Sequence, residues 1–189
     1  MTYSFTVPLV PRGKGAARHG TTRTGIHVTY KDAKTENYMA AVATCAASAL
    51  SGVRLDGPLK IDIVAVFPRT KELLRLHGRG PDKGKLVHGA GRIWCPQKPD
   101  KDNIDKAIFD SLKAWLRDDC KVVCGDTPKV YCATNEAPHV EVYILEPPPV
   151  DLYFVERGWP LPCVDPNLPI GMSPMDIREE DLAPEERKP

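Results

Sequence analysis

Residues 98–116 decide the fold, and they read KPDKDNIDKAIFDSLKAWL. Apolar residues recur there every three or four positions, which is the period of an amphipathic helix: Ile104, Ala107, Ile108, Leu112, Trp115 and Leu116. Pro99 disfavours helical backbone just before it, so the pattern predicts a helix over 103–116, starting near Asp102 or Asn103. Asp100 is then extended, and its side chain and that of Asp102 point the same way.

Strand and helix patterns alternate on both sides of this stretch. Segment 59–67, LKIDIVAVF, alternates strictly, and strands are also predicted at 3–10, 121–125 and 139–146. In the last of these, His139, Glu141, Tyr143 and Leu145 share one side. An Ala-rich helix is predicted over 35–50, capped by Thr35 or Asn37. This order predicts the α+β class, with a single mixed sheet and helices packed on it.

The composition changes near residue 147. Residues 147–189 hold ten of the nineteen prolines, and proline cannot sit inside a helix or donate to a sheet. We therefore expect a domain over 1–146 and a Pro-rich acidic tail over 147–189, partly docked through its aromatic residues and partly disordered.

The formal net charge of +1 conceals an asymmetry. Residues 1–99 carry 16 Lys+Arg and 6 Asp+Glu, a charge of +10; the corresponding values are −4 for 100–146 and −5 for 147–189. A basic half followed by an acidic cluster favours a polyanion partner beside a carboxylate-rich site. Two solvated faces of a neutral protein are the alternative.

Several classes of protein are excluded by what the sequence lacks. There is no run of eighteen apolar residues, so no membrane span is expected. The N-terminus does not resemble a secretion signal, and the six cysteines form no C-x-x-C pair of the kind found in zinc sites. These features predict a cytoplasmic protein with reduced thiols.

The acidic residues suit a hard cation. Asp100 and Asp102 repel each other unless a proton or a cation lies between them, and their oxygens suit Mg²⁺ or Mn²⁺. Lys106 lies one helical turn after Asp102, where it could reach a phosphate, and Asp118 and Asp119 follow the helix. Such a set could support phosphodiester hydrolysis. Alternatively, Asp102 or Asn103 is only a helix cap, with Asp105 a charge favourable to the helix dipole, and Asp118–Asp119 is only a turn. An EF-hand does not fit the spacing.

Together these residues form the pattern K-P-D-x-D-N-x-x-K-x-x-x-D-x-L followed by D-D-x-x-V, from Lys98 to Val122. The pattern resembles the RusA family of Holliday-junction resolvases, many of them carried by phages and prophages. The resemblance extends over about residues 3–146, including the basic P-x-x-P-R-G-K segment near the N-terminus and the helix around Tyr38.

The resemblance implies a small homodimeric crossover junction endodeoxyribonuclease that binds four-way or related branched DNA and makes paired symmetric nicks with Mg²⁺. It assigns Asp100, Asp102 and Asp119 as the essential metal-binding carboxylates and Lys106 as the essential lysine. Asp118, a further candidate ligand, and Asp110 also match the pattern. If the chain is encoded by a phage, the implied location is the host cytoplasm.

The basic loops at 12–25 and 69–92 are then candidates for DNA contact, by charge and shape more than by base reading. The candidate residues are Arg12, Lys14, Arg18, Arg23, Arg69, Arg75 and Arg79. Two other functions stay open: a branched-DNA-binding protein without catalysis, and an interaction subunit that recruits a partner through its Pro-rich tail.

Overall fold

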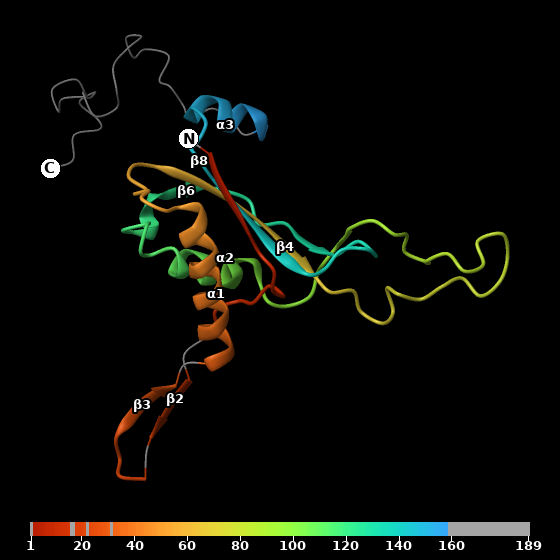
Figure 1. The fold of residues 1–189 in the computed structure, drawn as a ribbon, viewed down its shortest axis with the longest axis horizontal. Helices are drawn as coiled ribbons and strands as arrows, with labels where there is room; N and C mark the ends of the chain where they lie inside the picture. The colour runs from red at the N-terminus through yellow and green to blue at the C-terminus, as the bar shows by residue number, and fades with distance from the viewer. Residues whose placement is uncertain (1, 16–17, 22, 31, 159–189) are drawn as a thin grey trace, which may run out of the picture. The chain divides into compact units, whose positions relative to one another are not determined.

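The computed structural model describes residues 2–15, 18–21, 23–30 and 32–158 (Figure 1). It consists of two units, 1–147 and 148–189. The first unit contains the sheet and two long helices, α1 (Ala33–Ala49) and α2 (Lys101–Ser111).

The first unit is built on a mixed six-stranded sheet. The strand order is β1 (Thr2–Val7), β8 (His139–Leu145), β4 (Leu59–Phe67), β7 (Lys129–Tyr131) and β5 (Ile93–Trp94), and β6 (Val122–Cys124) also pairs with β4. The strand β4 is antiparallel to β8 but parallel to both β6 and β7. A single mixed sheet with helices confirms the predicted α+β class.

The core lies between α1 and α2 and one face of this sheet. Alternate residues of β4 are buried in it, among them Ile61, Ile63 and Ala65, and the same alternation occurs in β8. Four residues of the predicted apolar stripe are fully buried in this core. They lie in α2 and at its C-cap: Ile104, Ala107, Ile108 and Leu112. Burying this stripe turns the polar face of α2 outward and fixes its rotation.

A glycine lets the link between β6 and β7 pass close to β4. At Gly125 the backbone has φ +152°, and a Cβ atom there would lie 1.9 Å from the carbonyl oxygen of Ile61. The link continues the ladder, because the Ile63 N–H donates to the Asp126 carbonyl at 2.8 Å. The following residue, Thr127, donates through its hydroxyl to Asp105 and so attaches α2 to the sheet.

The predicted strands at 3–10, 59–67, 121–125 and 139–146 are confirmed, with ends shifted by up to three residues. The helix predicted over 103–116 instead begins at Lys101 and ends at Ser111, after which Leu116 forms a bridge with Leu55. The first helix begins at Ala33 because Asp32 is its N-cap, accepting from the Thr35 N–H at 3.3 Å.

Three features were not predicted. Strands β5 and β7 have only two and three residues, too few to produce a visible alternation. The predicted loop at 12–25 contains β2 (Arg18–Thr21), which forms a separate two-stranded hairpin with β3 (His27–Tyr30), just after that loop. A 3₁₀ helix, η1 (Asp119–Lys121), precedes β6.

The second unit contains α3 (Val150–Glu156), and the Arg157 guanidinium lies 4.4 Å from the centre of the Tyr153 ring. The predicted docking and disorder of the tail concern mainly residues 159–189, which lie outside the described residues. Among the helices that are described, none combines the length and apolar character needed to cross a membrane.

Candidate active site

The acidic motif forms the start of α2. Asp100 is the N-cap, with extended backbone at φ −68° and ψ 153° as predicted, and its side chain makes no capping hydrogen bond. Asp102 lies in the first turn, where its Oδ2 accepts a hydrogen bond from Lys106 Nζ at 2.9 Å. This hydrogen bond lowers the pKa of Asp102. The motif therefore presents an exposed carboxylate–ammonium pair at a helix N-terminus.

The second acidic pair lies at η1. Asp118 caps this short helix, its Oδ1 accepting from the Cys120 N–H at 3.1 Å, and this hydrogen bond lowers the pKa of Asp118. Asp119 is exposed and lies near enough to Lys113 to raise the pKa of that lysine, although Asp110 is the main cause. Within the described part of the chain, Asp100, Asp102, Asp118 and Asp119 form no group of three whose ligand atoms all lie within 4.8 Å.

The first basic loop packs directly on the motif helix. The Lys14 N–H donates to the Asn103 carbonyl at 2.7 Å, and Lys14 Nζ donates to the Asp110 carboxylate. A Cβ atom on Gly13 would lie 2.7 Å from Pro99 Cβ and 2.9 Å from Asn103 Cβ, so the absence of a side chain permits the approach. Segments some 90 residues apart thus meet at the acidic motif.

Asp110 holds this loop on α2 through Lys14. Its carboxylate accepts from Lys14 on one side and from Lys113, at 2.5 Å, on the other. Burial acts to raise the pKa of Asp110, but the hydrogen bonds from Lys113 and Lys14 outweigh it and hold the pKa below its usual value.

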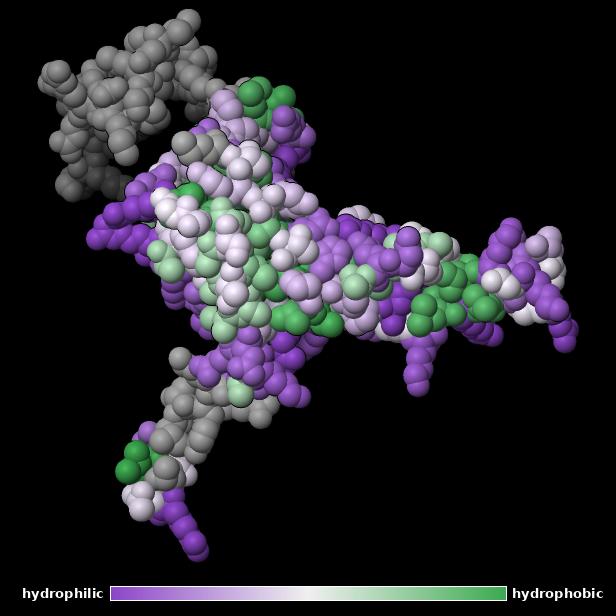
Figure 2. Space-filling model, viewed as in Figure 1, coloured by the Kyte–Doolittle hydropathy of each residue, from purple (hydrophilic) through white to green (hydrophobic). Residues whose placement is uncertain are grey.

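The other predicted DNA-binding residues are spread over three segments. Arg12 precedes Gly13 and pairs with Asp32 at 3.7 Å, Arg18 begins β2, and Arg23 is exposed between β2 and β3. Arg75 and Arg79 are exposed on the loop of residues 68–92, which leaves the end of β4 and returns to β5 (Figure 1). Figure 2 shows mostly hydrophilic side chains along this loop, interrupted by an apolar patch.

Arg69 has a different environment from the other arginines. Its Nε donates to the Cys132 carbonyl and its Nη1 to the Gly89 carbonyl, both at 2.8 Å, while Nη2 donates to the Gly91 carbonyl. The guanidinium therefore joins the two ends of the 68–92 loop to each other and to the residue after β7. We call this arrangement the Arg69 clamp.

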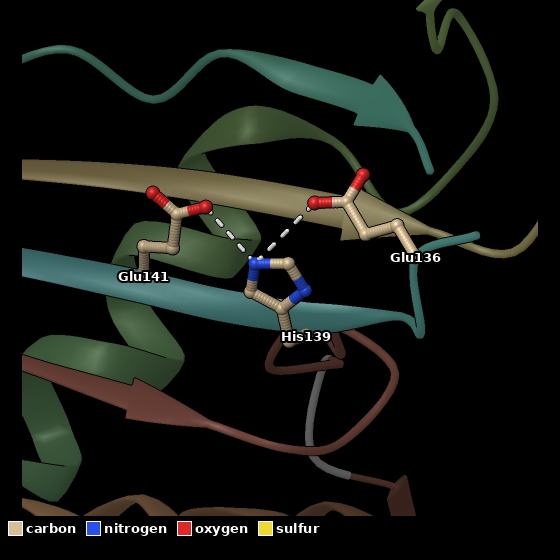
Figure 3. A group of neighbouring side chains, drawn as sticks. All are labelled: Glu136, His139 and Glu141. Carbon is tan, nitrogen blue, oxygen red and sulfur yellow. Dashed lines mark hydrogen bonds and ion pairs between the residues drawn. The ribbon is translucent and has the colours of Figure 1, made fainter. Parts of the chain in front are cut away.

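A second charged group lies on the sheet face opposite α1 and α2. The side chains of Glu136, His139 and Glu141 converge there (Figure 3), with ligand atoms within 4.8 Å of one another, a spacing compatible with a metal ion. Arg92, however, forms ion pairs with both carboxylates of this group. Its Nη2 lies 2.5 Å from Glu136 Oε1 and 2.7 Å from Glu141 Oε1. In this arrangement the Arg92 guanidinium supplies the positive charge between the two carboxylates.

Both ring nitrogens of His139 face acceptors, namely the Ala137 carbonyl at 2.8 Å and Glu141 Oε1 at 2.9 Å. A ring that donates from both nitrogens is an imidazolium. Burial opposes this charge, but the two hydrogen bonds outweigh burial and raise the pKa of His139. Burial likewise acts to raise the pKa of Glu141, while His139, Arg92 and Tyr143 together lower it to about 2. When His139 is protonated, two cations and two carboxylates balance.

Sequence reasoning missed two features of this region. The His139–Glu141 spacing within a strand does place both side chains on one face, but nothing in the sequence indicated that Arg92 would join them. Trp94 was not identified either; it follows Arg92 by two residues and its side chain is exposed. A two-residue strand gave no pattern by which its orientation could be predicted.

An α+β domain that presents exposed carboxylates and a lysine at a helix N-terminus, together with two basic loops, has the features of a protein acting on a phosphate polyanion. The family model of endodeoxyribonuclease RusA matches residues 8–145. The chain therefore belongs to the RusA endodeoxyribonuclease family, a family of DNA-binding nucleases that act in Holliday-junction resolution and recombination. No curated protein matched the sequence.

Proposed function

We propose that the chain is a Mg²⁺-dependent endonuclease that resolves four-way junctions or related branched DNA by paired symmetric nicks, acting as a homodimer in the cytoplasm. The observation that carries this proposal is the Asp102–Lys106 pair at the start of α2, 2.9 Å apart and exposed on both sides. Lys106 is held where its ammonium would lie within reach of a phosphate on a cation ligated by Asp102.

The donor set at this site fits a hard divalent cation. Asp100, Asp102 and Asp119 would hold Mg²⁺, with Asp118 as a further candidate and Mn²⁺ as an alternative ion, because all four side chains are exposed carboxylates. When bound, the ion would supply charge neutralisation and activation of water. Two features of the chain prepare the site: the Asp100 carboxylate is not used as a cap, and buried Ile104 and Ile108 fix the polar face of α2 outward.

Lys106 would stabilise the negative charge that develops on the phosphate. In the structure its ammonium is held by Asp102. With Asp102 engaged by a cation, Lys106 Nζ would be available to donate to a phosphate oxygen, because the two side chains lie one helical turn apart on α2. An ammonium one helical turn from the metal ligand stabilises negative charge where it forms.

The basic loops would hold the DNA on either side of the motif. The first loop is hydrogen-bonded to Asn103 through Lys14, and the second leads through β5 directly into Lys98 and Asp100. Arg12, Lys14, Arg18, Arg23, Arg75 and Arg79 are the proposed phosphate contacts, while Arg69 acts by shaping the second loop. Binding through phosphates makes the affinity depend strongly on salt.

The test is cleavage of a synthetic four-way junction over a titration of Mg²⁺, with a linear duplex of the same arm sequence as control substrate. The wild type should nick opposing strands in pairs, and Asp102→Asn should abolish nicking while junction binding persists. Asp82→Asn is the matched control, because Asp82 is an exposed carboxylate paired with Lys85 at 2.9 Å. Wild-type nicking by Asp102→Asn would refute the site, and absence of nicking by the wild type with any divalent ion would refute the function.

A further inference from the structure

Trp94 is the most exposed large hydrophobic residue among those the structure describes, with 74% of its surface accessible. We propose that its indole ring stacks on an unpaired nucleobase at the branch point of the DNA substrate. This proposal rests on the proposed function, and it adds a residue that selects branched DNA over linear duplex.

The backbone holds Trp94 rigidly in this exposed position. Its neighbours point the other way: Ile93 packs on the core and Cys95 is buried. The strand pairs Trp94 with Val130, and the Cys95 N–H donates to the Lys129 carbonyl at 2.9 Å. Because side chains alternate along a strand, the indole must point to the sheet face opposite α1 and α2. A rigid aromatic ring loses little conformational entropy when it binds.

Trp94 also lies close to the acidic motif along the chain. Asp100 lies six positions after Trp94 in the sequence, a span of about 20 Å at most. The intervening segment is fastened to the sheet, because Lys129 Nζ donates to the Gln97 carbonyl at 2.5 Å. A DNA strand rises about 3.4 Å per nucleotide, so about six nucleotides are enough to span the distance between the Cα atoms of Trp94 and Asp100.

The basic segment that contains Trp94 favours DNA over a second copy of the chain. Residues 69–98 contain eight Lys+Arg and two Asp+Glu, a formal charge of +6. In a symmetric dimer the same patch meets itself, so a contact centred on Trp94 would bring two such segments together. Phosphates, by contrast, are attracted by this charge. Stacking then needs a base with a free face, which a branch point offers and a continuous duplex does not.

The experiment compares the affinities of a four-way junction and a linear duplex, measured in EDTA so that binding is separated from cleavage. Trp94→Ala should weaken junction binding by about 5- to 150-fold, the range found for loss of one stacked base, and should weaken duplex binding much less. Trp94→Phe should restore most of the affinity. Val123→Ala, which trims an exposed apolar residue of β6, should leave both affinities unchanged.

Tryptophan fluorescence gives a second readout that does not depend on affinity. The chain has three tryptophans, so junction binding should quench the wild type by a component that disappears in Trp94→Phe. Thermal unfolding checks that each variant folds, and sedimentation checks its oligomeric state.

Several outcomes would overturn the proposal. These are an unchanged junction affinity in Trp94→Ala, an equal loss on junction and duplex, or a change of oligomeric state, which would make Trp94 a contact between copies. Persistence of the full quench in Trp94→Phe would also count against it. The wild type reports separately on the proposed function: if it binds the junction no better than the duplex, that function fails first and the stacking role fails with it.

Discussion

Lys14 and Asp110 lie 96 positions apart in the sequence, and the ammonium of the first donates to the carboxylate of the second. Lys113 donates to the other oxygen of the same carboxylate at 2.5 Å. This contact fastens the first basic loop to the helix that carries the acidic motif. The loop is therefore part of the site's architecture before any DNA is bound.

The first prediction concerns this pair. In a double-mutant cycle with Lys14→Met and Asp110→Asn, the coupling free energy measured by urea unfolding should be about 0.5–1 kcal/mol, as for a partly exposed ion pair. Lys113→Met, which removes the second partner, is the control for charge alone. Strictly additive effects of Lys14→Met and Asp110→Asn would show that the contact does not hold the loop.

The second prediction concerns Lys106. Lys106→Met should lower the rate of junction cleavage at saturating Mg²⁺ by about 10²- to 10³-fold, the usual cost of removing one group that stabilises developing charge, with junction affinity little changed. Lys113→Met removes an ammonium that lies beyond the end of the same helix and should slow cleavage only a few-fold. Equal effects of the two substitutions would contradict the assigned role.

The third prediction tests the close packing of Gly13. Gly13→Ala places a Cβ atom 2.7 Å from Pro99 Cβ and 2.9 Å from Asn103 Cβ. Since neither neighbour is the tip of a flexible side chain, we expect a loss of about 1–3 kcal/mol in unfolding free energy and slower cleavage. Gly15→Ala is the matched control, because nothing lies within 4 Å of the Cβ position there. A neutral Gly13→Ala would mean that the loop is not seated on the helix.

The fourth prediction follows from the raised pKa of His139. A raised pKa in the folded state stabilises the fold fully below the ordinary value of about 6.5, and the stabilisation is lost as the pH rises through the folded-state pKa. The wild type should therefore lose unfolding free energy as the pH rises above about 6.5. In His139→Asn this loss should be absent, so the difference between the two curves should change over this range and then become constant. Parallel curves would exclude His139 as the titrating group.

The sequence predicted the elements whose pattern is long enough to read. Nine residues of alternating LKIDIVAVF identified β4 without error, and the apolar stripe from Ile104 to Leu112 identified the buried face of α2. The extended backbone of Asp100 followed from Pro99. The patterns of β4 and α2 could be read because burial of one face selects apolar residues at the repeat of the strand or helix.

Contacts between distant segments could not be predicted in the same way. In the sequence, Lys14 and Arg69 both look like surface charges. In the structure Lys14 donates to Asp110, whereas Arg69 donates to backbone carbonyls. Likewise Asp105, which the pattern treats as a charge favourable to the helix dipole, accepts from Thr127 and Lys101. These partners are set by the fold of the whole chain, and one sequence carries no signal for them.

The Arg69 clamp determines how the 68–92 loop can change over evolution. Because the guanidinium joins both ends of the loop, the roughly twenty residues between them form a closed unit whose length hardly affects the core: doubling such a loop costs only about 0.6 kcal/mol. Insertions and deletions near Arg79 should therefore be tolerated, whereas replacing Arg69 should release the whole segment. The clamp therefore lets the length of the loop vary independently of α2 and its acidic motif.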